Sequence, residues 1–155
     1  MSQLGEPKRL SMTIRTATAL DQAALFDLVR SFPSPSTRTP DGYADALRIK
    51  LSDQSYATLV AEDKDRLIGY LAGYAHRTFY AGGSIAWVDE IWVEPDYRGQ
   101  GTGRLLMDAF EGWASRQGCL QVSLATSGAA AFYERLGYAS SAGYFKKYLN
   151  GGSVA

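Results

Sequence analysis

The sequence predicts one mixed α/β domain, in which about four helices flank a central, mostly antiparallel sheet. Its 155 residues are 46% hydrophobic, which suffices for one full core rather than two small ones. Segments with strand-like alternation and segments with a helical period follow each other in the order β-α-α-β-β-β-α-β-α-β. A glycine-rich turn joins the strand before the third helix to that helix. We expect a flexible leader at residues 1–10, the domain at residues 11–149 and a short tail at residues 150–155.

The first part of the domain is predicted to form a strand and two helices. Weak alternation over residues 12–16 indicates the strand. Apolar residues recur at helical spacing from Leu20 to Val29, and Asp21 could cap this first helix. A proline- and hydroxyl-rich connection at residues 31–40 precedes a second apolar helical period, which comprises Tyr43, Leu47 and Leu51.

Three strands follow. Residues 56–61 and 67–75 flank a polar turn, which is typical of an antiparallel hairpin. The third strand, residues 85–93, is preceded by two glycines and ends before Pro95. Its carboxyl end therefore leads directly into the glycine-rich turn.

After that turn, one apolar stripe predicts a helix that lies on the sheet, with Leu105, Leu106, Ala109, Phe110, Trp113 and Ala114 on the buried face. Gly118 ends this helix. The remaining segments are predicted as a buried strand at residues 120–125, a short helix at residues 129–136 and a last strand at residues 144–149.

The glycine-rich turn carries the clearest functional signal. Gly99, Gly101 and Gly103 alternate just before the helix, and glycine permits the positive φ angles that turn successive N–H groups toward one point. The helix adds its unpaired amides and the positive end of its dipole. The turn therefore predicts a site for a phosphate or pyrophosphate group, with a simple helix-capping turn as the alternative.

Spacing excludes two common phosphate-binding loops. A Walker loop requires Gly-Lys-Ser/Thr, but Arg104 follows Gly103. A dinucleotide-binding fingerprint requires a glycine where Arg104 stands. The pattern that fits is Arg-x-x-Gly-x-Gly, beginning at Arg98, and on it the chain resembles the GNAT superfamily of acetyl-CoA-dependent N-acetyltransferases over residues 14–149.

This resemblance implies that acetyl-CoA is the co-substrate and that two neighbouring segments bind it. The strand before the turn would splay from its neighbour and hold the pantetheine arm and thioester carbonyl at Ile91, Trp92 and Val93, unless these are ordinary core residues. The pyrophosphate would be held, mainly by backbone N–H groups, at Arg98, Gly99, Gln100, Gly101, Thr102, Gly103 and Arg104. For each arginine, a solvated surface charge is the alternative.

The resemblance also implies roles for the residues around the short helix. Tyr133 matches the tyrosine that protonates the leaving thiolate in many GNAT enzymes, and a phenol remains protonated at neutral pH. A core tyrosine with a satisfied hydroxyl is the alternative. Phe132 belongs to the same motif and is expected at the cofactor, while Thr126 replaces the family's usual asparagine and leaves one hydroxyl for that contact.

Asp89 and Glu90 are the candidates for the base that removes a proton from the acceptor ammonium. Strict alternation would group Asp89 with Ile91 and Val93, so only one of the two acids faces the cleft unless a bulge intervenes. A carboxylate among apolar neighbours should have a raised pKa. We favour Asp89 narrowly, because it aligns with the acid of similar polyamine acetyltransferases; a solvated strand-edge charge is the alternative.

Composition limits the partners. Sixteen basic residues balance sixteen acidic residues, so neither nucleic acid nor an anionic membrane is expected. The single Cys119 excludes an internal disulfide framework, and no signal peptide or membrane span is recognisable, so the cytoplasm is expected. No ligand spacing around the only histidine, His76, supports a metal site. A homodimer is plausible from the family and from the apolar final strand.

The patterns and the resemblance to the GNAT superfamily together imply an acetyl-CoA-dependent N-acetyltransferase that transfers acetyl directly to a primary amine of a polyamine, aminoglycoside, amino-acid-like molecule or peptide. The main alternative is an acyl-CoA-binding module of the same fold without catalysis. A nucleotide-dependent phosphotransferase is a weaker hypothesis, since it would need magnesium ligands near the loop and only Glu94 and Asp96 lie there.

Overall fold

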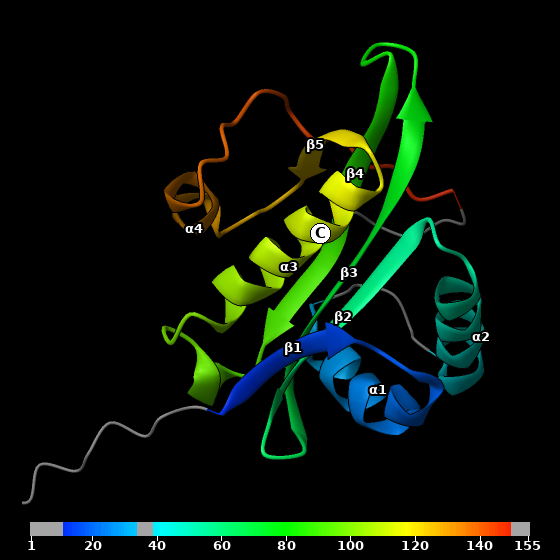
Figure 1. Cartoon of the computed structure of the whole chain (residues 1–155), viewed down its shortest axis with the longest axis vertical. Helices are drawn as coiled ribbons and strands as arrows, with labels where there is room; N and C mark the ends of the chain where they lie inside the picture. The colour runs from blue at the N-terminus through cyan, green and yellow to red at the C-terminus, as the bar shows by residue number, and fades with distance from the viewer. Residues whose placement is uncertain (1–10, 34–38, 150–155) are drawn as a thin grey trace, which may run out of the picture.

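The computed structural model describes residues 11–33 and 39–149, and it contains a five-stranded sheet (Figure 1). The strands lie in chain order across the sheet. The first four are antiparallel to their neighbours, whereas the fifth runs parallel to the fourth. The predicted mixed, mostly antiparallel sheet is thus confirmed, with strands β1 Met12–Thr16, β2 Tyr56–Asp63, β3 Arg66–Thr78, β4 Gly83–Val93 and β5 Cys119–Leu124.

Helices α1 Gln22–Ser31 and α2 Pro40–Ser52 cover one face of this sheet, and α3 Thr102–Arg116 covers the other. Side chains of α3 pack with Leu59 and Ala61 of β2 in one apolar cluster. Val60, between them, packs with α1 and α2 in a second cluster on the other face. Alternation along β2 therefore supplies both halves of the core. The short helix α4 Ala130–Arg135 follows β5 and lies beside α3 (Figure 1).

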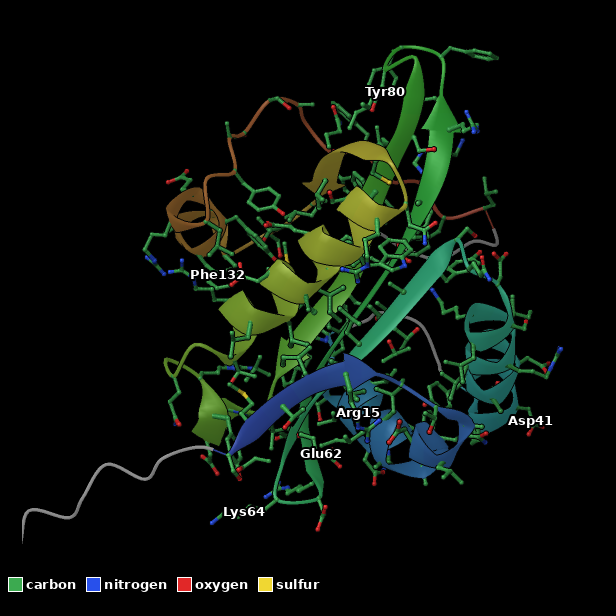
Figure 2. All side chains as sticks on the ribbon, in the orientation of Figure 1. Arg15, Asp41, Glu62, Lys64, Tyr80 and Phe132 are labelled. Carbon is green, nitrogen blue, oxygen red and sulfur yellow. The ribbon has the colours of Figure 1, made fainter. Side chains whose placement is uncertain are left out.

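Asp21 stands at the start of α1 as predicted, but its carboxylate does not cap the helix. The carboxylate instead accepts two hydrogen bonds from the Arg15 guanidinium, both at 2.8 Å, and one from the Thr18 backbone N–H at 2.8 Å. Arg15 also contacts Glu62 on the adjacent strand, at 3.1 Å (Figure 2). Asp21 therefore ties β1 and β2 to the beginning of α1.

The prediction of a last strand at residues 144–149 is wrong, because these residues form no strand in the structure. Tyr144, Phe145 and Leu149 in this segment are 67%, 95% and 90% exposed. Alternation predicts which side chains share a face, but a strand also requires a hydrogen-bonded neighbour. Within the described chain, this segment has no such neighbour, and the only strand partner of β5 is β4.

Within residues 11–33 and 39–149, no helix is long and apolar enough to cross a membrane.

Candidate active site

A cleft opens where β4 and β5 separate. The two parallel strands pair from Ser84 with Cys119 as far as Val88 with Leu124, and no further. β4 nevertheless continues for five residues and remains paired with β3 as far as Val93. Among the described residues, the β5-facing edge of this last part of β4 therefore has no strand partner, and it carries Ile91, Trp92 and Val93.

The cleft has a volume of about 750 Å³, large enough for a sizeable organic ligand. All but one of the predicted site residues line it. The exception is Gln100, whose side-chain amide donates to the Asp96 carbonyl at 3.1 Å. The sequence patterns did not predict several other lining residues, which include Phe32, Pro33, Tyr97 and Arg135.

The glycine turn forms one end of the cleft. Gly99 and Gly101 have φ angles of 74° and 87°, in the left-handed region that side chains disfavour. A Cβ at either position would meet no atom within 4 Å, so the backbone there faces open space. Gly101 directly precedes α3 as its N-cap and offers no side-chain cap, which leaves the first amides of the helix available to a ligand. This arrangement is a suitable pyrophosphate site.

Gly103 serves a different purpose from its neighbours. It is already part of α3, and a Cβ on it would lie 3.2 Å from the ring carbon Cζ of Phe132. The small size of Gly103 therefore lets Phe132 of α4 pack against the start of α3. Figure 2 labels Phe132. Gly103 nevertheless lines the cleft beside Phe132.

The two arginines of the loop differ in their surroundings. Arg98 donates from Nε to the Val93 carbonyl at 2.9 Å, and its guanidinium lies 4.6 Å from the centre of the Trp92 ring. These contacts hold it against the end of β4, with its terminal nitrogens left to meet an anion. Within the described ranges, Arg104 makes only a long, exposed contact of 3.9 Å with Asp108, which is weak in water.

A β-bulge lies at the two candidate acids. Glu90 pairs with Ala72 and Val88 pairs with Gly73, so Asp89 is the extra residue on β4. The bulge resets the alternation, because Val88 and Ile91 both pack on the α3 side of the sheet. Grouping Asp89 with Ile91 and Val93 by strict alternation is therefore wrong, because a bulge interrupts β4 at this point.

Asp89 faces α2, where its Oδ2 lies 3.6 Å from Nζ of Lys50. Burial raises the pKa of Asp89, while the Lys50 ammonium opposes that rise. The predicted direction of the pKa is thus confirmed for Asp89. Glu90 lines the same cleft and is engaged in contacts of its own.

Tyr133 is buried in the wall of the cleft opposite β4. Its ring packs edge-to-face on Phe132 at 5.0 Å and on Tyr138 at 5.9 Å, which fixes its orientation. Burial raises its pKa, so the phenol keeps its proton at neutral pH. Its hydroxyl takes part in none of the hydrogen bonds between described residues, and it is thus available as an acid.

Thr126 lies in the cleft, but its hydroxyl oxygen is already used. It accepts from the Ala129 backbone N–H at 3.1 Å and so holds the turn that leads into α4. The same oxygen also accepts from the Gly128 backbone N–H at 3.5 Å, so the hydroxyl proton is what remains for a ligand. Cys119 is free but lies outside the cleft, and no cluster of metal-ligating side chains occurs in the described ranges.

Comparison with known proteins gives consistent results. Residues 54–140 match the model of the acetyltransferase (GNAT) domain family. A curated Bacillus subtilis (strain 168) protein, described as the uncharacterized N-acetyltransferase YhfO, is 26% identical over 145 residues, covering 90% of this chain and 97% of its own.

Solved structures share the fold. Glucosamine-6-phosphate N-acetyltransferase from Arabidopsis thaliana has a TM-score of 0.80 at 18% identity, over 90% of this chain and 99% of that one. The aminoglycoside N-acetyltransferase AAC(6')-Iy in complex with CoA has a TM-score of 0.76 at 17% identity, over 93% and 99% of the two chains. At these identities the likeness concerns the fold alone.

Proposed function

Since the chain belongs to the acetyltransferase (GNAT) domain family and is an acetyl-transferring enzyme, we propose that it transfers acetyl from acetyl-CoA directly to the primary amine of a small molecule or peptide. The cleft between β4 and β5 carries this proposal. It combines an anion cradle at one end, an unpaired strand edge along its length and a buried tyrosine opposite two acids.

The residues of the cleft fit the proposed co-substrate. The positive-φ glycines and the uncapped start of α3 suit its pyrophosphate, and Arg98 can add a charged contact. The free β4 edge at Ile91, Trp92 and Val93 suits the amide-containing pantetheine arm, because an unpaired strand edge offers hydrogen bonds to an extended chain.

Acetyl-CoA supplies the thioester whose carbonyl carbon the acceptor nitrogen attacks. Asp89 or Glu90 would accept the proton that the acceptor ammonium loses, directly or through water. Attack forms the carbon–nitrogen bond and a tetrahedral oxyanion, and Tyr133 would give its proton to the sulfur as that species collapses and the carbon–sulfur bond breaks. The tetrahedral oxyanion would be stabilised by backbone N–H groups of the open β4 edge.

Tyr133→Phe tests this proposal. We expect kcat to fall by about two orders of magnitude with acetyl-CoA affinity nearly unchanged, because only the acidic proton is lost. Tyr80→Phe is the matched control, since Tyr80 is 74% exposed at the far tip of the β3–β4 hairpin (Figure 2). An unchanged kcat in Tyr133→Phe removes this tyrosine from the mechanism, whereas binding without any turnover in the parent protein favours the non-catalytic acyl-CoA-binding module.

We propose further that the chain acts in the cytoplasm and forms a homodimer. Support for a dimer comes from the β5 edge, where exposed Leu120 lies on a strand that pairs only with β4 within the described chain. The exposed residues 144–149 have a strand-like sequence that a second copy could pair with that edge. Sedimentation at micromolar concentration tests the homodimer, and a monomeric mass would contradict it.

A further inference from the structure

The Lys50 ammonium is held against the candidate base. Lys50 lies in the last turn of α2, and its side chain is only 24% exposed. Its Nζ lies 3.6 Å from Oδ2 of Asp89 and 4.8 Å from the centre of the Tyr56 ring. A carboxylate, an aromatic face and the negative end of a helix all favour a cation at this point. Lys50 is therefore a fixed positive charge rather than a solvated one.

Lys50 does not line the cleft, but it contacts an acid that does. Asp89 lines the cleft and also contacts α2, so it connects the proposed thioester region with the α2 face of the sheet. On that face the rings of Tyr56 and Tyr74, from paired strands, lie 6.2 Å apart. An amine that reaches Asp89 from this side meets Lys50 as well.

The ion pair discriminates between acceptors by charge. A primary amine arrives as an ammonium. Lys50 repels any cationic group that the acceptor places beside Asp89. Glu90, the neighbouring acid, is engaged in contacts of its own. An acceptor that carries an anionic group next to its amine avoids the repulsion, since the anion pairs with Lys50 while the ammonium pairs with Asp89.

We propose that the acceptor is a zwitterionic amine of the α-amino-acid type, with its ammonium on Asp89 and its carboxylate on Lys50; this inference rests on the proposed acetyl transfer. The distances agree, because the nitrogen and carboxylate oxygens of an α-amino acid lie roughly 3 Å apart, close to the 3.6 Å between Asp89 and Lys50. Polyamines, which bring further cations, are disfavoured by the same charge.

The test compares matched acceptors. Acetylation of phenylalanine and phenethylamine, and of alanine and ethylamine, is measured for the parent protein, since each pair differs only in the carboxylate. Spermidine represents the polyamines. The same acceptors are then given to Lys50→Met, to Lys50→Arg, which keeps the charge, and to Arg48→Met. Arg48 is the control because it removes one positive charge from the same helix at a side chain that is 71% exposed.

In the parent protein we expect kcat/KM to favour each amino acid over its decarboxylated partner by at least about tenfold. Lys50→Met should abolish this preference through a higher KM for the amino acids, whereas Lys50→Arg and Arg48→Met should retain it. An equal preference in Lys50→Met and the parent protein, or a parent preference for spermidine, overturns the proposal. Absence of acetylation with all five acceptors overturns the amino-acid proposal, whereas acetylation of a peptide or an aminoglycoside would still support the proposed function. Circular dichroism of Lys50→Met checks its fold; if that variant is unfolded, Lys50→Gln removes the same charge and should lose the preference in the same way.

Discussion

Replacing Asp21 by asparagine should destabilise the protein in a pH-dependent manner. The Arg15 guanidinium donates two short hydrogen bonds to this carboxylate and, with the Thr18 backbone N–H, lowers the pKa of Asp21 from an ordinary 3.8 to about 2. A difference of that size corresponds to about 2 kcal/mol in the free energy of unfolding. Glu62 remains as a partner for Arg15, so about 2 kcal/mol is the upper end of the expected loss.

The sign follows from proton linkage. Because folding lowers the pKa of Asp21, its stabilisation is complete above pH 3.8, decreases as the pH falls from there, and is lost below about pH 2. Urea unfolding of the parent protein and Asp21→Asn between pH 7 and pH 2 measures this dependence. The difference between the two proteins should be largest at pH 7 and vanish near the acid end.

Asp45→Asn is the control, because Asp45 is 74% exposed and its contact with Arg48 is 3.7 Å long. It should change the free energy of unfolding by less than about 1 kcal/mol at any pH. The reasoning is refuted if Asp21→Asn is as stable as the parent protein at pH 7, or if its deficit persists unchanged at pH 2.

Two further predictions concern the cleft. Gly101→Val should weaken acetyl-CoA binding by about tenfold in calorimetry, since a β-branched residue is strained at a φ of 87° and its side chain projects into the cradle. Gly118→Val, at a φ of 74° beyond the other end of α3, should lose similar stability but bind normally; equal binding losses would contradict the cradle. Burial raises the pKa of Asp89. If Asp89 is the base, lowering the pH should therefore reduce kcat at a higher pH than an ordinary aspartate would. Asp89→Asn should remove this acid limb of the pH profile. A limb that persists in Asp89→Asn and disappears in Glu90→Gln assigns the base to Glu90.

Local patterns predicted the features that depend on neighbouring residues in the chain. β1 begins and ends at the predicted residues 12–16, because the alternating side chains that predict it lie within the strand itself. The glycine turn was predicted for a similar reason, since positive φ at Gly99 and Gly101 and the start of α3 depend on a few consecutive residues.

Features that depend on distant partners were not predicted. The bulge at Asp89 arises from the register between β4 and β3, and no pattern within β4 encodes that register. Lys50 reaches Asp89 from another helix, so sequence spacing carries no sign of the pair. Residues 144–149 alternate like a strand, but the partner that a strand requires is missing among the described residues.

The most direct test of the central claim is release of the free coenzyme A thiol when the purified protein is incubated with acetyl-CoA and a panel of amines. The panel contains amino acids, short peptides, polyamines and aminoglycosides. We predict release above the amine-free control for at least one acceptor, with the acetylated amine recovered in equal amount. If no acceptor raises the release and acetyl-CoA leaves the melting temperature unchanged, the account of the cleft is contradicted.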